Sequence, residues 1–133
     1  MLGVVVDTSV WIDFLSFHEK DSEEVKKMEV LVFQKQVLLC PPVYQEILQG
    51  IRDEARFCKV KDILSLFPML EPDFPYIEDT AVGLYRSLRK QGITIRKPDD
   101  CLIAAYALVH DVPVLFNDRD FNMMCLHSAL RAY

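Results

Sequence analysis

The stretch L-G-V-V-V-D-T-S-V-W-I-D-F-L, residues 2–15, places a short apolar run directly before three polar residues and a mixed apolar pattern. The run Leu2–Val6 is rich in β-branched residues and predicts a strand buried on both faces of a parallel sheet. Asp7, Thr8 and Ser9 end the run, and each is a residue type that caps helices. Because the apolar residues that follow recur at helical spacing, the stretch predicts a strand, a turn and a helix in that order.

The rest of the chain repeats this alternation of short apolar runs and amphipathic stretches. Val37–Cys40 and Val114–Phe116 predict two further buried strands, and Leu66–Leu70 predicts a short one that contains Pro68. Helices are expected from Val10 to Phe17, over residues 22–34, 43–51, 53–66 and 76–91, after Pro98, and in part from Phe121 onward. Short buried strands that alternate with helices predict an α/β fold whose parallel sheet is covered on both faces.

Length and composition favour one ordinary globular domain. The chain has 133 residues, enough for one core and too few for two, so we expect a single domain over residues 1–133. No apolar run is long enough to span a bilayer and no signal-like segment starts the chain, so we expect a cytoplasmic protein without membrane contact. The cysteines form no C-x-x-C pair, which favours reduced thiols over a zinc site. They are Cys40, Cys58, Cys101 and Cys125.

Acidic residues follow the predicted strands or lie early in the helices after them. They are Asp7 after the first strand, Glu46 in the helix after the second, Asp99 and Asp100 at the start of the Pro98 helix, and Asp118 and Asp120 after the last strand. Each alone could cap a helix, face solvent or, within residues 117–120, belong to a polar turn. The carboxyl ends of parallel strands meet at one edge of the sheet, so several of these acids should meet there. Two such charges about 4 Å apart repel by about 4 kcal/mol near a protein surface, so the group needs a cation or shared protons.

The donor types indicate which cation would bind. Carboxylates without paired His or Cys residues are hard oxygen ligands, which favour Mg²⁺ or Mn²⁺ over zinc. Such an ion activates a water for attack on a phosphate ester and neutralises the charge that develops. The acids therefore predict a metal site suited to phosphate ester chemistry.

The net charge of −5 has the wrong sign for a protein that binds nucleic acid through bulk electrostatics. If four acids belong to a metal site, the rest of the chain carries only one net negative charge. Each basic residue could lie on a solvated helix face, but as a group they are available to contact a phosphate backbone. They are Arg52, Arg56, Lys59, Lys61, Arg86, Arg89, Lys90, Arg96 and Lys97.

Four motifs occur together in this chain. They are V-V-V-D-T-S-V-W-I-D (residues 4–13), the helix with Glu46, D-C-L-I-A-A (residues 100–105) and F-N-D-R-D-F (residues 116–121). In order and spacing they resemble PIN-domain proteins, specifically the VapC-type toxins of type II VapBC toxin–antitoxin pairs. The resemblance implies a three-layer α/β/α sandwich with a short central parallel sheet. It implies an endoribonuclease that depends on Mg²⁺ or Mn²⁺ and cuts structured RNA, often tRNA. It also implies a homodimer and a cognate VapB-type antitoxin that blocks the site.

The resemblance assigns roles residue by residue. Its catalytic and metal-binding acidic quartet falls on Asp7, Glu46, Asp100 and Asp118. Asp100 takes this place rather than Asp99, because Asp100 lies three residues before the I-A-A run that starts at Ile103. Ser9 matches a small hydroxyl residue that steadies the first acid, and Asp120 adds a fifth acid in a supporting position.

The expected chemistry is hydrolysis by metal-activated water without a covalent enzyme intermediate. Asp7, Asp100 and Asp118 would hold the ion, and Glu46 would complete the ligand set or orient the water. One position departs from the family pattern. A threonine often stands two residues before the fourth acid, and Phe116 occupies that place, so a hydroxyl that could orient a carboxylate or a water is missing.

Three other classes of protein share one feature each with this chain, and the sequence argues against each of them. D-T-S also occurs at the active-site turn of aspartic proteases, but those enzymes are built of strands, and this chain is rich in helical periodicity. A haloacid-dehalogenase-type phosphatase would carry a second acid where Ser9 stands, and a receiver domain would need a phosphoacceptor Asp and a Lys that we cannot place. A solitary RNA-processing PIN nuclease, or a PIN-like domain that binds RNA or protein without cutting, remains the alternative.

Overall fold

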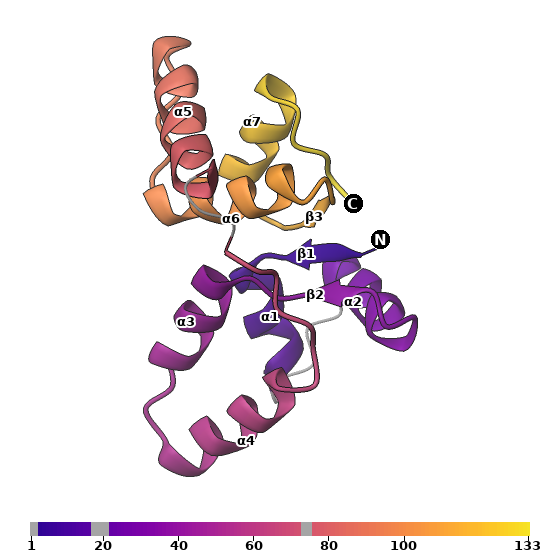
Figure 1. Cartoon of the computed structure of the whole chain (residues 1–133). Coiled ribbons are helices and arrows are strands. Elements are labelled where there is room, and N and C mark those ends of the chain that lie inside the picture. The colour runs from indigo at the N-terminus through magenta and orange to yellow at the C-terminus, as the bar shows by residue number, and fades with distance from the viewer. Residues whose placement is uncertain (1–2, 17–21, 73–75) are drawn as a thin grey trace.

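Three short parallel strands form the centre of the fold. The computed structural model describes residues 3–16, 22–72 and 76–133. Its strands are β1 (Val4–Val6), β2 (Val37–Leu38) and β3 (Val114–Leu115), in the order β2-β1-β3 (Figure 1). Both pairings are parallel, with Val5 of β1 opposite Leu38 on one side and Val114 on the other. The central strand is buried along its whole length, as its uninterrupted apolar sequence predicts.

Helices fill the connections between the strands. They are α1 (Thr8–Leu15), α2 (Glu23–Phe33), α3 (Pro41–Gln49), α4 (Glu54–Leu64), α5 (Tyr76–Lys90), α6 (Pro98–Val109) and α7 (Arg119–His127). In Figure 1, α1 to α4 gather around β2 in the lower half, and α5 to α7 gather around β3 in the upper half. The chain passes from β1 to β2 through α1 and α2, and from β2 back across β1 to β3 through α3 to α6. Helices lie on both sides of the strands (Figure 1), as expected for a three-layer α/β/α sandwich.

Local signals in the sequence explain where several helices begin and end. The Ser22 side chain caps α2 by accepting from Val25 N at 3.1 Å, and Asp53 caps α4 by accepting from Arg56 N at 2.8 Å. Gly92 ends α5 in the left-handed region, with φ of +81°, as the prediction of a helix stop there requires. Such caps are local, so sequence alone predicts them well.

The predicted strand Leu66–Leu70 is wrong, because this segment makes only one bridge, from Met69 to Leu39 beside β2. Some of its backbone groups cannot join a sheet. Phe67 N donates to Leu64 O and closes the end of α4, and Pro68 has no N–H to donate. A ladder longer than one bridge therefore cannot form.

Other boundaries shift by a few residues. The second strand ends at Leu38, because Cys40 already begins α3 as its N-cap. The last helix begins at Arg119, before the predicted Phe121, because the Asp118 side chain caps it. The predicted positions of Leu2 and Phe17 lie outside the described residues.

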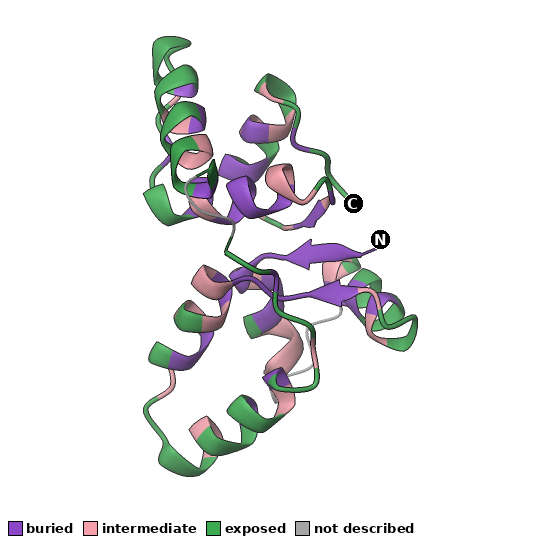
Figure 2. Ribbon diagram, in the orientation of Figure 1, coloured by how far each residue is buried: buried purple, intermediate pink, exposed green. Residues whose placement is uncertain are grey.

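The core lies around the strands and along α6, as the buried residues in Figure 2 show. Trp11 and Phe121 are its largest fully buried side chains. Trp11 packs edge-on against Phe14 and Phe67, at centroid distances of 6.3 and 5.1 Å. All four cysteines are free, as predicted. None of the helices in the described ranges is long and apolar enough to cross a membrane.

Candidate active site

The fold brings the ends of β1 and β3 together where the direction of the strand order reverses. Asp7 directly follows β1, and Asp118 comes shortly after β3. The backbone N of Asp7 donates to Leu115 O at 2.9 Å, so the end of β1 is attached to the end of β3. In open α/β sheets this position is where a ligand crevice forms.

A cavity of about 650 Å³ opens at this point, and all four acids of the predicted quartet line it. Asp7 comes from the end of β1, Glu46 from α3, Asp100 from α6 and Asp118 from the start of α7. Asp99, the neighbour that the prediction set aside, is exposed and does not line the cavity. We call this space the acid cavity.

Asp7 does not cap the helix that follows it. It stands at the N-cap position of α1, but its side chain makes no capping hydrogen bond. Instead, Ser9 Oγ donates to Asp7 Oδ2 at 2.6 Å, as the prediction that Ser9 steadies the first acid requires. Asp7 is only 4% exposed, so this bond fixes a buried carboxylate. The backbone N–H groups of Thr8 and Ser9 also act on this carboxylate and lower its pKa.

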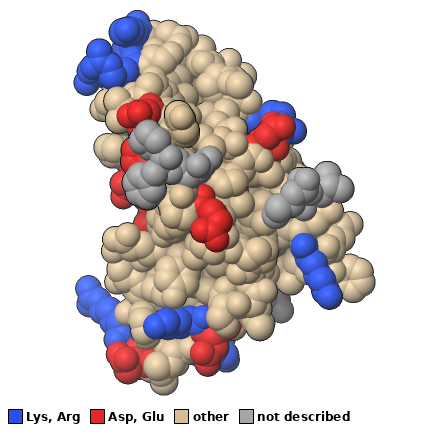
Figure 3. Space-filling view, viewed as in Figure 1, with Lys and Arg blue, Asp and Glu red and all other residues tan. Residues whose placement is uncertain are grey.

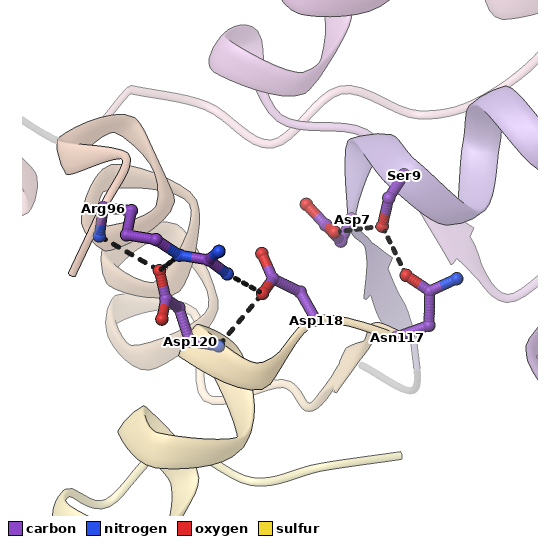
Figure 4. A network of polar contacts seen from close by, with 6 residues as sticks. All are labelled: Asp7, Ser9, Arg96, Asn117, Asp118 and Asp120. Carbon is purple, nitrogen blue, oxygen red and sulfur yellow. Dashed lines mark hydrogen bonds and ion pairs between the residues drawn. The ribbon is translucent and has the colours of Figure 1, made fainter.

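Asn117 joins this contact from the other side of the cavity. Its Oδ1 lies 2.9 Å from Ser9 Oγ, as Figure 4 shows. A hydroxyl has one hydrogen, so when Ser9 donates to an ionised Asp7, Asn117 must turn its Nδ2 toward Ser9 and donate to it. The sequence predicts only a polar turn at Asn117, although its place directly before Asp118 was the signal for a role in the site.

A second group of contacts joins Asp118, Asp120 and Arg96. Asp118 Oδ1 accepts from Asp120 N at 3.0 Å and lies 3.5 Å from Arg96 Nη2. Asp120 Oδ2 accepts from both Arg96 N and Arg96 Nε, at 3.0 and 3.3 Å. Figure 4 shows this group facing Asp7, with the Asp118 carboxylate in the space between. Arg96 thus holds two acids in place, a role that its sequence position does not reveal.

Asp120 lies closer to the centre of the site than its predicted supporting role implies. Carboxylate oxygens of Asp100, Asp118 and Asp120 all lie within 4.8 Å of one another, a spacing at which they could hold one metal ion. Asp100 and Asp120 are buried, and Asp118 is half-buried. The described residues thus offer this trio in addition to the predicted quartet.

Mutual repulsion and burial both act on the acid cavity. The pKa of Asp100 is raised to about 7, first by burial and then by the charges of Asp7, Asp118 and Glu46. Burial is also the main reason why the pKa of Asp7 and that of Glu46 are raised. The positive charge of Lys97 lowers the pKa of Glu46 and of Asp100, but this effect is smaller than the rise that burial and the other acids cause. A cation among these carboxylates would relieve the repulsion.

Two buried oxygens point to the same conclusion. Glu46 Oε1 and Thr8 Oγ1 are buried at the acid cavity without a hydrogen bond of ordinary geometry among the described residues, although the Thr8 hydroxyl lies close enough to lower the pKa of Glu46. A buried polar atom without a partner is costly. The donors of the cavity are hard oxygens, so a divalent ion such as Mg²⁺ or Mn²⁺, with its bound water, fits them.

A sequence model of the PIN domain matches residues 4–125 of this chain. The chain belongs to the PIN-domain family. It is similar to ribonuclease VapC11 of Mycobacterium tuberculosis and to VapC ribonuclease Mb1587 of Mycobacterium bovis. Each is 29% identical to it over 131 residues, which make up 97% of this chain and 96% of the relative.

Solved structures share the PIN fold with this chain. VapBC2 from Rickettsia felis, bound to a DNA fragment from its promoter, has a TM-score of 0.76 at 17% identity, covering 100% of this chain and 98% of that one. DNA-bound VapBC from Salmonella typhimurium has a TM-score of 0.75 at 19% identity, with the same coverage. FitAcB from Neisseria gonorrhoeae has a TM-score of 0.73 at 18% identity, covering 98% and 96%. At these identities the likeness shows the fold.

Phe116, which stands where PIN proteins often have a threonine, packs against the core. Its ring stacks on Phe121, with centroids 5.6 Å apart and an interplanar angle of 22°. The hydroxyl expected at this position is therefore replaced by an apolar contact that supports the start of α7. Ser9 and Asn117 supply hydrogen bonds close by, on the Asp7 side.

An apolar groove of about 370 Å³ adjoins the acid cavity in this PIN domain, and both share Ile12, Glu46 and Gly50. Of the predicted basic residues, Arg52 and Arg56 line this groove, and Lys97 lines the acid cavity itself. Figure 3 shows other basic side chains away from the site, at the upper end of α5 and, mixed with acids, around α4.

Proposed function

We propose that this chain is a metal-dependent endoribonuclease and the toxin of a VapBC-type toxin–antitoxin pair. The observation that carries the proposal is the acid cavity, where four carboxylates from four separate elements meet. Membership of the PIN family and the similarity to ribonucleases named VapC support the same activity.

Asp7, Asp100 and Asp118 would hold the Mg²⁺ or Mn²⁺ ion, and Asp120 lies close enough to share it. When bound, the ion would lower the pKa of a water and neutralise charge on the phosphate. Ser9 holds Asp7 in its orientation, and Arg96 holds Asp118 and Asp120. Glu46, which lines the same cavity, would orient the attacking water and accept its proton. The water oxygen would bond to phosphorus as the bond from phosphorus to one ribose oxygen breaks, and the leaving oxygen would take up a proton.

The test is RNA cleavage by purified protein in Mg²⁺ or Mn²⁺. Asp7→Asn and Asp100→Asn should each lower cleavage by roughly a thousandfold or more, because each removes a charged ligand while keeping its shape. Asp99→Asn, an exposed neighbour of equal chemistry, is the matched control and should cleave normally. Excess chelator should abolish cleavage by the unchanged protein.

Full activity of Asp7→Asn or Asp100→Asn, or cleavage in excess chelator, would contradict this mechanism. Mapping new 5′ RNA ends after induction in cells identifies the substrate, for which we propose a structured RNA such as a tRNA in the cytoplasm. If the chain cuts RNA but has no antitoxin partner, a solitary processing nuclease is the better description.

The proposal includes a homodimer and a VapB-type antitoxin. The solved structures with the same fold include VapBC complexes, and the apolar groove beside the acid cavity offers this chain a place for a partner segment. Leu15, Ile47 and Val60 give the groove apolar walls, with Arg52 at its edge. Co-expression of the antitoxin should relieve growth arrest, and light scattering should give twice the mass of one chain.

A further inference from the structure

A second cavity lies on the side of the acid cavity that faces α7. Its volume is about 520 Å³, and it shares Ser9, Lys97 and Asp118 with the acid cavity. Its wall adds Arg96, Asn117, Arg119 and Asp120, so three basic and two acidic side chains line it, and the basic ones are in excess. We call it the cationic cavity.

The three basic residues of the cationic cavity differ in what they already contact. Arg96 is committed to Asp118 and Asp120, at 3.5 and 3.3 Å. Lys97 and Arg119 are exposed, and neither has an ion pair or hydrogen bond from its side chain within the described part of the chain. Lys97 acts on Glu46 and Asp100 only through its charge, and Arg119 is not among the groups that shift the pKa of any acid of the cavity.

Their positions in the fold make this placement specific. Lys97 is the N-cap residue of α6 and Arg119 is the first residue of α7, the two helices that also carry Asp100 and Asp120. The elements that deliver acids to the site thus also deliver a cation to its edge.

RNA bound at the acid cavity needs such cations. An ion among the carboxylates can neutralise the scissile phosphate, but it does not neutralise the next phosphate along the strand. That phosphate would approach a chain of net charge −5 and would be repelled unless the protein supplied positive charge locally. A guanidinium suits this task, because its N–H groups match two phosphate oxygens.

We propose that the cationic cavity binds the RNA phosphate next to the scissile one, through Arg119 and Lys97. The inference rests on the proposed ribonuclease function and adds a direction to it. The bound RNA would run from the acid cavity past Asp118 toward α7. It would not be confined to the apolar groove, which adjoins the acid cavity on the side of α3 and α4.

Arg119 is the better residue to change in a test. Lys97 lowers the pKa of Glu46 and Asp100, so its loss would disturb the acids, whereas Arg119 is not among the groups that shift any of them. Arg119→Gln removes the charge, Arg119→Lys keeps it, and Lys90→Gln removes one at the far end of α5 (Figure 1) as the matched control.

The experiment measures binding of a fluorescent single-stranded RNA of about twelve random nucleotides by anisotropy in Mg²⁺, in the Asp100→Asn background. Near 0.1 M salt, Arg119→Gln should weaken binding roughly fivefold and lower the slope of log affinity against log salt by about 0.7, the value for one lost phosphate contact. Arg119→Lys should keep the slope, and Lys90→Gln should leave both quantities unchanged. Melting temperatures check that each variant is folded.

An Arg119→Gln variant with the affinity and slope of the Lys90→Gln control overturns the phosphate site, while cleavage by the unchanged protein still supports the nuclease. No RNA binding by the parent together with no cleavage by the unchanged protein overturns both. Loss of antitoxin binding with RNA binding intact assigns the cavity to the protein partner and also overturns the inference. If Arg119→Gln melts early, Arg119→Ala, measured against the same Lys90→Gln control, gives the same test.

Discussion

At the scale of single residues, Asp100 shows what the gathering of acids costs. Burial and, after it, the charges of three other carboxylates raise its pKa to about 7 from an ordinary 3.8. Between these two values the unfolded chain has lost the proton while the folded chain keeps it. The folded state therefore binds more protons in this window, and stability falls as pH rises through it.

Metal-free protein should accordingly lose stability from about pH 4 to about pH 8, by on the order of 2 to 4 kcal/mol from Asp100 alone. Urea unfolding in chelator at both pH values measures the difference. Asp100→Asn should flatten the pH dependence, and Asp99→Asn should not. Equal slopes for the two variants would show that Asp100 titrates normally.

Ser9 should act on catalysis through Asp7. Ser9→Ala removes the 2.6 Å bond to Asp7 Oδ2, which both orients that carboxylate and lowers its pKa. We expect kcat to fall by about tenfold, roughly the worth of one hydrogen bond to a charged group, and the acid limb of the pH profile to move upward. Ser9→Thr keeps the hydroxyl and should retain most of the activity. A normal pH profile in Ser9→Ala would argue against this role.

The roles of Asn117 and Arg96 in the site could not be predicted from the sequence, and the physical reason is the same for both. Asn117 and Arg96 act through partners far away in the chain, since Ser9 and Asn117 are 108 positions apart and Arg96 and Asp120 are 24 apart. A spacing pattern identifies residues of one element, but it cannot show which side chain of another loop lies opposite. The quartet could be predicted because each acid follows a strand or starts a helix.

At the scale of elements, the helix caps show how much is encoded locally. Ser22 caps α2 and does not line the acid cavity, so its effect on stability can be separated from catalysis. Ser22→Ala should lower the free energy of unfolding by about 1 kcal/mol and leave RNA cleavage unchanged. Ser22→Asp should restore the stability. A change in cleavage with stability intact would contradict this separation.

The segment Leu66–Leu70 shows the limit of local information. Its apolar residues satisfy a strand pattern, but Pro68 and the end of α4 leave it one bridge to Leu39. The competition between closing a helix and extending a sheet is decided by tertiary packing, which a run of residues does not record.

At the scale of the whole molecule, the strand order β2-β1-β3 explains why the site exists at all. It places the first strand beside the last, so the carboxyl ends of β1 and β3 open into one cavity. The general place of the site could be predicted, because ligand crevices of open α/β sheets lie at the carboxyl ends of the strands, but the strand order could not, because it depends on contacts between distant parts of the chain.

The core beneath this cavity should control the stability of the whole. Trp11 is fully buried one turn after Asp7, and Trp11→Ala should cost about 3 to 5 kcal/mol and abolish cleavage by unfolding the chain. Trp11→Phe should cost less than about 1.5 kcal/mol, because the indole Nε1 has no hydrogen-bond partner in the described part of the chain. Denaturant unfolding distinguishes the two. Similar losses for both variants would show that the indole N–H is satisfied.

The attachment of Asp7 to Leu115, at opposite ends of the sequence, also has a consequence for biosynthesis. During translation Asp7 and β1 emerge long before β3 and Asp118, so one wall of the acid cavity is absent in the interval. The carboxylates of the acid cavity therefore cannot meet before β3 has emerged from the ribosome.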